Sequence, residues 1–212
     1  MKYFRIKLMY ALLGPIQGYF RKKRMTAFNH FLDTVEAQNP RILDLGGQPG
    51  IWVYIERPLD IVILNLPGVA NTLHYSHHNI SYVEGDACDL SAYCDGEFDL
   101  VFSNSVIEHV GDAAKIQQFC QEAMRVGKKL WVQTPSKYFP IEPHTGMPFW
   151  WWYPASLKRY ILARWQRKLP GWTAMVATTT YVRREELIRL FPKATIRVER
   201  FAGLPKSYIA VQ

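Results

Sequence analysis

A glycine-rich turn after a short apolar run has the clearest capacity for chemistry in this chain. Residues 41–50 read RILDLGGQPG, so an acid, Asp44, is followed by Gly46, Gly47 and Gly50. Glycines let the backbone approach a ligand closely, and a turn from a strand into a helix presents free amide donors to that ligand. We therefore expect residues 44–50 to form a ligand-binding loop.

The spacing of these glycines disfavours a nicotinamide or flavin dinucleotide as the ligand. The dinucleotide fingerprint is G-x-G-x-x-G, and counting from Gly46 its second and third glycine positions hold Gln48 and Ile51. A nicotinamide-dependent oxidoreductase is therefore a disfavoured interpretation.

The loop belongs to a chain in which short apolar runs alternate with helical or turn-rich stretches. Five runs predict strands at 42–45, 61–64, 80–83, 100–102 and 130–132, and two alternating stretches at 195–201 and 208–211 predict a terminal antiparallel hairpin. Helical spacing is clearest before the fifth strand, where Ile116, Phe119, Cys120 and Ala123 share a face and Gly127 is placed as a cap. This order predicts an α/β fold, with a Rossmann-like, mostly parallel seven-stranded sheet and helices on both faces.

One main domain fits a chain of 212 residues. We expect an N-terminal basic helical segment at 1–38, whose residues 25–35 lead into the core, and a main domain at 39–212 with a helix at 183–191. Residues 136–175 hold five of the seven tryptophans and are too long for an ordinary connection. They predict an aromatic and basic lid insertion with its own helix near 156–168.

The motifs and their order resemble the class I S-adenosylmethionine-dependent methyltransferases, in particular the type 11-like methyltransferase domain. The first motif of that family is an acid, a spacer and glycines, as in Asp44-Leu45-Gly46-Gly47 with Gly50, and residues 98–110, FDLVFSNSVIEHV, resemble its fourth-strand motif. The resemblance covers residues 41–135. It implies that S-adenosylmethionine binds at the carboxyl ends of the first four strands.

Cofactor contacts are implied by the resemblance, residue by residue. Asp44 would orient the methionine amino end, Asn65 stands where the family usually has an acid that binds the ribose hydroxyls, and Asp86 stands in the adenine-edge motif. A turn or cap role is the alternative for Asp86. Asn65 and Gln48 depart from the family pattern, and an amide lacks the charge-assisted bond of a carboxylate. The implied cofactor residues are Asp44, Gly46, Gly47, Gln48, Gly50, Asn65, Leu66, Asp86, Ala87, Ser103 and Asn104.

Two histidines are candidates for the catalytic base that removes a proton from the acceptor. His109 follows the fourth strand and His144 opens the insertion, and histidine titrates near neutral pH. A structural or cofactor-lining role is the alternative for each. His74, His77 and His78 lie in a polar loop without an accompanying cysteine or carboxylate pattern, so the sequence predicts no metal site.

Two acid-free segments make the chain basic. Residues 1–32 and 143–184 each hold seven Lys/Arg and no acid, whereas the other 138 residues hold 12 basic and 18 acidic side chains. This distribution, with the rings of 149–153, predicts peripheral contact with an anionic membrane surface through 1–24 and 149–168. Solvated faces and packing of the aromatic side chains onto the core are the alternatives.

The location that we expect is cytoplasmic, peripheral at the membrane. No run reaches the ~18–20 apolar residues that span a bilayer, and the three cysteines lack a pairing pattern, which fits a reducing compartment.

The sequence thus predicts methyl transfer from S-adenosylmethionine to a small or lipid-linked acceptor, at oxygen. A nucleic-acid acceptor is disfavoured, because enzymes that methylate amino groups of bases usually carry Asn/Asp-Pro-Pro-aromatic after the fourth strand, where this chain reads SNSV at 103–106. The alternative, from another class of protein, is a catalytically inactive cofactor-binding accessory protein at a membrane or partner surface. The departures from the family pattern at Gln48 and Asn65 suggest this alternative.

Overall fold

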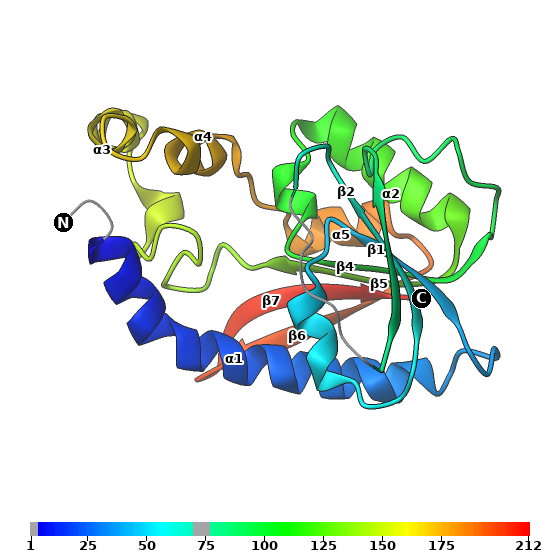
Figure 1. Cartoon of the computed structure of the whole chain (residues 1–212). Helices are drawn as coiled ribbons and strands as arrows, with labels where there is room; N and C mark the ends of the chain where they lie inside the picture. Colours follow the sequence, from blue (N-terminus) through cyan, green and yellow to red (C-terminus); the bar gives the residue numbers. More distant parts are fainter. Residues whose placement is uncertain (1–3, 70–76) are drawn as a thin grey trace.

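One sheet forms the centre of the computed structural model, which describes residues 4–69 and 77–212 except for the side chains of 4–13, 15 and 16 (Figure 1). Its strand order within the described residues is β3-β2-β1-β4-β5-β7-β6. β1 to β5 are parallel, and β7 runs antiparallel to both β5 and β6. The strands are β1 Arg41–Leu45, β2 Asp60–Asn65, β3 Asn79–Glu84, β4 Phe98–Asn104, β5 Gly127–Pro135, β6 Thr195–Phe201 and β7 Leu204–Val211. The predicted fold class is confirmed.

Helices cover both faces of this sheet. α1 (Phe4–Leu32) and the short 3-10 helix η1 (Pro49–Tyr54) lie on one face, and α2 (Ala113–Val126) and α5 (Arg184–Leu190) lie on the other (Figure 1). Successive strand residues alternate between the two layers, so that Ile42 packs on the α1 side and Leu43 on the α2 side. Because both faces are buried, the central strands read as continuous apolar runs.

The C-terminal half of α1 belongs to the main core. Met25 and Phe28 are fully buried, and the Phe28 ring contacts Trp52, Phe102 and Trp131 with centroids 4.8–5.8 Å apart. The helix begins at Phe4, much earlier than the apolar spacing of residues 25–35 indicated. Of the predicted segment 1–38, residues 1–3 lie outside the described residues. α1 therefore folds together with the sheet and can form one wall of a site there.

The predicted insertion contains the 3-10 helix η3 (Trp150–Trp152) and the helices α3 (Ala155–Gln166) and α4 (Pro170–Thr178). α3 matches the helix expected near 156–168, whereas α4 was not expected. α3 buries none of its side chains, and it lies with α4 beyond the edge of the sheet, at the same end of the molecule as the start of α1 (Figure 1). Its function as a lid stays a prediction. Across the described parts of the chain, no helix has the length and apolar character needed to cross a bilayer.

Candidate active site

A cavity of about 430 Å³ lies at the carboxyl ends of β1, β4 and β5. Its wall combines α1, the loop after β1, the ends of β4 and β5, the start of the insertion and the β6–β7 hairpin. Small-molecule sites commonly occupy about 300–1,000 Å³, so the cavity has the size of a ligand site. The predicted site residues in its lining are Asp44, Gly46, Gly47, Gln48, Gly50, Asn104 and His144.

Asp44 is held at the floor of this cavity with one oxygen unsatisfied. Its side chain is fully buried, and Nε1 of Trp52 donates a hydrogen bond to Oδ2 over 2.8 Å. Oδ1 is buried and has no hydrogen-bond partner among the described residues. Burial outweighs the hydrogen bond from Trp52 and raises the pKa of Asp44 to about 7. An unsatisfied carboxylate oxygen here favours a ligand that brings a hydrogen-bond donor, above all a cationic one.

The loop over Asp44 requires glycine at two positions. A Cβ on Gly47 would lie 1.9 Å from Oδ2 of Asp44, and a Cβ on Gly46 would lie 2.6 Å from Cγ1 of Val106. Gly46 also has a φ of +69°, which side-chain-bearing residues rarely adopt. The sequence motif therefore has a direct physical cause, because the backbone must pass close to the carboxylate.

Five predicted cofactor residues lie outside the lining of this cavity, and four of them lie at the ends of β2 and β3: Asn65, Leu66, Asp86 and Ala87. Nδ2 of Asn65 donates to the carbonyl of Gly47 over 3.0 Å, which ties the end of β2 to the glycine loop. Asp86 is exposed, accepts a hydrogen bond from the Cys88 amide over 2.8 Å and lies 3.5 Å from Nζ of Lys115. These contacts fit the turn role weighed for Asp86. The cofactor contacts of these four residues stay predictions.

The polar residues at the end of β4 divide between core and cavity. Ser103 is fully buried, and its Oγ donates to the carbonyl of Leu45 over 3.1 Å, so its side chain joins β4 to β1 and does not reach the cavity. Asn104 and Ser105 line the cavity instead. Ser105 was not predicted as a site residue, and its φ of +59° marks the sharp turn that places it there.

Arg24 is a site residue that the sequence analysis missed. Its guanidinium group is buried and binds Glu199 of β6 through Nε, over 2.9 Å, and Nη2, over 2.5 Å. Nη1 donates to Oδ1 of Asn104 over 2.5 Å and to Oε1 of Gln133 over 3.1 Å. A single side chain thus joins α1 to the ends of three strands along the cavity wall.

Aromatic rings and a lysine line another part of the cavity. Phe20, Phe139 and Phe201 belong to the lining, and Nζ of Lys206 lies 4.4 Å from the centroid of the Phe20 ring. Burial, and then the charge of Arg24, lower the pKa of Lys206 to about 8. This part of the cavity suits an apolar ligand body next to a polar or anionic group.

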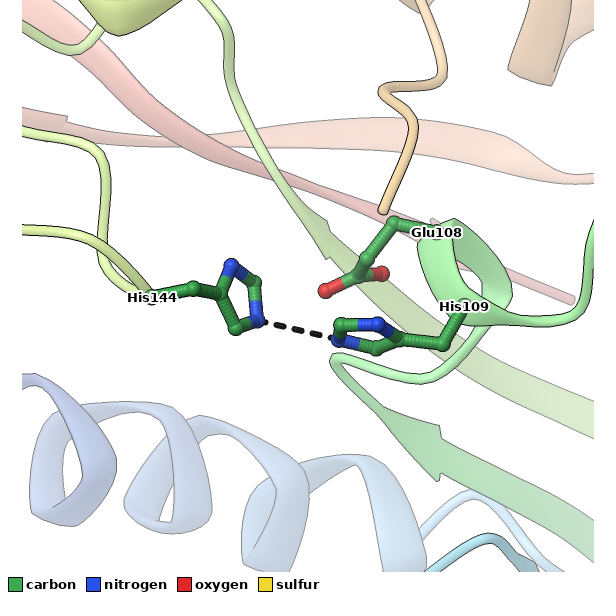
Figure 2. A group of neighbouring side chains, drawn as sticks. All are labelled: Glu108, His109 and His144. Atoms are coloured by element: carbon green, nitrogen blue, oxygen red, sulfur yellow. Dashed lines mark hydrogen bonds between the residues drawn. The ribbon is translucent and has the colours of Figure 1, made fainter. Parts of the chain in front are cut away.

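The two predicted catalytic histidines lie side by side (Figure 2). Nε2 of His109 and Nε2 of His144 are 3.0 Å apart, although 34 residues separate them in the chain. His144 lines the large cavity, and His109, in the 3-10 helix η2 (Ile107–His109), does not. Glu108 lies beside both rings, with its carboxylate fully buried.

The surroundings of the two histidines act on them in opposite ways. Burial, and then the charge of His144, lower the pKa of His109 to about 4. Burial opposes protonation of His144 too, but the hydrogen bond and charge of Glu142 outweigh it and raise its pKa. Burial raises the pKa of Glu108 to about 7. The structure thus brings the two predicted residues together and adds two carboxylates that the sequence analysis did not select.

Known proteins share the fold that carries this site. A family model described as a methyltransferase domain matches residues 63–130. An S-adenosylmethionine-dependent methyltransferase from Archaeoglobus fulgidus has the same fold, with 12% identity, a TM-score of 0.51 and coverage of 90% of this chain and 94% of that one. A protein from Pyrococcus horikoshii shows 16% identity, a TM-score of 0.52 and coverage of 89% of each chain.

A third solved structure is magnesium protoporphyrin IX methyltransferase from Synechocystis, with bound S-adenosylhomocysteine. It shows 10% identity and a TM-score of 0.56, and the match covers 99% of this chain and 94% of that one. Identities this low establish the shared fold alone, which is the fold of S-adenosylmethionine-dependent methyltransferases. Residues 63–130 are in addition similar to a methyltransferase domain.

Proposed function

We propose that this protein transfers a methyl group from S-adenosylmethionine to an oxygen of a small or lipid-linked acceptor. The observation that carries the proposal is the buried, unpartnered Oδ1 of Asp44 under a loop that tolerates only glycine at Gly46 and Gly47. The cofactor supplies an electrophilic methyl group on a sulfonium, and its methionine end carries an ammonium group. Asp44 would bind that ammonium group and so fix the orientation of the cofactor.

The chain itself would supply orientation and exclusion of water. Orientation of reacting groups contributes up to about 7–11 kcal/mol in favourable systems. The rings of Phe20, Phe139 and Phe201 would hold the apolar body of the acceptor, and Lys206 would contact a polar or anionic group on it. Activation of the acceptor hydroxyl falls to His144, which lines the same cavity, and to His109 beside it. This division of roles favours an amphiphilic acceptor.

The experiment that tests the proposal is calorimetric titration with S-adenosylmethionine and S-adenosylhomocysteine, which both carry the ammonium group. We expect Asp44→Asn to weaken binding of both at least about tenfold, because a hydrogen bond to a charged group contributes about 1.5–3 kcal/mol. Gly47→Ala should abolish binding, since its Cβ would collide with Asp44.

Gly171→Ala is the matched control, because nothing lies within 4 Å of the added Cβ at this exposed position. It should bind both compounds like the unchanged protein. Equal affinity in all variants would overturn the site assignment. Absence of binding in the unchanged protein would overturn the proposal, whereas binding without methyl transfer would favour the inactive cofactor-binding accessory protein.

A further inference from the structure

Hydrogen bonds from neighbouring residues fix which ring nitrogen carries the hydrogen in both imidazoles of Figure 2. His144 is fixed by a carboxylate. Nδ1 of His144 lies 2.6 Å from Oε1 of Glu142, whose other oxygen accepts a hydrogen bond from the Thr145 amide over 2.6 Å. A carboxylate only accepts hydrogen bonds, so Nδ1 of His144 must carry the hydrogen. In the neutral ring, Nε2 of His144 then presents a lone pair.

The ring of His109 is fixed in the same way by a threonine. Oγ1 of Thr179 donates to the carbonyl of Met175 over 2.8 Å, and a hydroxyl has one hydrogen to give. Thr179 therefore accepts a hydrogen bond from Nδ1 of His109 over 3.1 Å. Nε2 of His109 also presents a lone pair.

Two lone pairs thus face one another across 3.0 Å, which requires a cation between or beside them. A proton on one ring would satisfy the pair of nitrogens, but it leaves Glu108 unexplained. Oε1 of Glu108 is buried and has no hydrogen-bond partner among the described residues, while Thr134 donates to Oε2 over 2.9 Å. Donor atoms of Glu108, His109 and His144 all lie within 4.8 Å of one another.

From these contacts we infer that Glu108, His109 and His144 form a binding site for a divalent transition-metal ion such as Zn²⁺. Ligand nitrogens about 2.0–2.1 Å from such an ion lie about 2.8–3.4 Å apart at coordination angles between 90° and tetrahedral, a range that includes the observed 3.0 Å. Two imidazoles and one carboxylate suit zinc, iron, cobalt or nickel, whereas Mg²⁺ and Ca²⁺ prefer oxygen ligands alone.

The three proposed ligands are held by hydrogen bonds of the kind found in protein metal sites. Glu142 and Thr179 bind the second nitrogen of each imidazole ring, and Thr134 binds the second oxygen of Glu108. Such contacts fix the ring orientation and the tautomer that a ligand needs. No metal site was predicted from the sequence, because these ligands come from two segments that are far apart in the chain.

The metal site would take part in the proposed methyl transfer, and its catalytic role therefore rests on the proposed function. Because His144 also lines the large cavity, an ion at this cluster could be reached by an acceptor hydroxyl. A bound metal ion lowers the pKa of a coordinated hydroxyl or water by acting as a Lewis acid. The two histidines would then activate the acceptor through the ion.

The test uses the full chain without a histidine tag, stripped with a chelator and titrated with ZnCl₂, CoCl₂ or MgCl₂. We expect Zn²⁺ and Co²⁺ to bind with a stoichiometry of one, Co²⁺ to give a visible absorption band, and Mg²⁺ not to compete. Glu142→Gln, which changes a residue that holds His144, should weaken Zn²⁺ binding about 10–100-fold. Glu108→Gln and His144→Gln, which remove proposed ligands, should each weaken Zn²⁺ binding more than that.

His77→Gln is the matched control, because His77 and His78 form the other pair of adjacent imidazoles, with centroids 4.1 Å apart. Its Zn²⁺ affinity should equal that of the unchanged protein. The inference is overturned if no stoichiometric binding occurs, which would leave a shared proton as the cation, or if His77→Gln abolishes binding while His144→Gln does not.

Titration of the same samples with S-adenosylhomocysteine separates this inference from the proposed function. Zn²⁺ binding without S-adenosylhomocysteine binding would support the metal site and contradict methyl transfer. The reverse result would support methyl transfer and contradict the metal site. If Glu108→Gln does not fold, the loss of the Co²⁺ band in His144→Gln, at a partly exposed position, decides the question.

Discussion

Among single residues, the carboxyl group of Asp44 links the site to the stability of the fold. Burial raises its pKa from an ordinary 3.8 to about 7. Between these two pH values, the folded protein therefore holds a proton that the unfolded chain has lost. The resulting stabilisation is fully present below about pH 4 and is lost as the pH rises through about 7. Ionised Asp44, the form that would bind the ammonium group of the proposed cofactor, is therefore obtained at the expense of stability.

We predict that Asp44→Asn removes this pH dependence. When the pH rises from 5.5 to 8, the Tm of the unchanged protein should fall by several degrees relative to the Tm of Asp44→Asn. In a domain of this size, about 1 kcal/mol corresponds to about 2–4 °C. Thermal unfolding of both proteins at the two pH values measures the shift. Parallel pH profiles would contradict the raised pKa.

Which site residues a sequence can reveal depends on how local their contacts are. Asp44, Gly46 and Gly47 were predictable because the carboxylate and the loop above it are neighbours in the chain. Arg24 was not, since its partner Glu199 lies 175 positions away. Ser103 was selected where Ser105 lines the cavity, because the turn that ends β4 depends on a φ of +59° that no periodic pattern signals.

At the scale of elements, Arg24 and Glu199 hold α1 against the β6–β7 hairpin. The side chains are 4% and 12% exposed, and Ser207 donates a short hydrogen bond to the same carboxylate. Loss of one partner of a buried ion pair costs about 3–5 kcal/mol, because the other charge stays buried without compensation. The pair is thus a buried link between two distant segments of the cavity wall.

We predict that Arg24→Leu lowers the free energy of unfolding by about 3–5 kcal/mol. Arg24→Leu combined with Glu199→Gln should cost less than the sum of the two single changes, since the double variant leaves no buried charge. Urea unfolding measures all three. Arg21→Leu, at an exposed position of the same helix, is the control and should change stability by no more than about 0.5 kcal/mol. A cost equal to that of Arg21→Leu would contradict the role of Arg24.

Helices and strands were predictable where burial against the sheet gives their sequence a regular pattern of apolar residues. All the strands of the described residues were predicted, the first five from short apolar runs and the last two from alternation. α2 was predicted because its apolar residues repeat with the period of a helix. α4 was missed although Pro170 stands at its first turn, a favoured position for proline, because the helix buries only Thr173 and Val176. α1 lies within the basic helical segment predicted at 1–38, although apolar spacing indicated a helix only over residues 25–35.

At the scale of the whole molecule, the two acid-free segments share one end. The described part of the first segment, residues 4–32, forms α1, and residues 143–184 contribute α3 and α4. The start of α1 lies with α3 and α4 at the end of the molecule away from β2 (Figure 1). Phe149, Trp152 and Tyr160 are exposed there by 57%, 52% and 64%. Exposed rings next to basic side chains are typical of surfaces that contact anionic lipid headgroups.

We predict that the protein sediments with vesicles that contain phosphatidylserine and not with vesicles of phosphatidylcholine alone. Each Lys or Arg near such a surface contributes about 1 kcal/mol, so Arg164→Gln with Arg167→Gln on and after α3 should weaken binding about tenfold or more. Arg189→Gln with Lys193→Gln, exposed but outside both acid-free segments, is the control and should bind like the unchanged protein. Equal weakening by both pairs would mean that net charge alone attracts the vesicles, and α3 would then have no part in docking an amphiphilic acceptor.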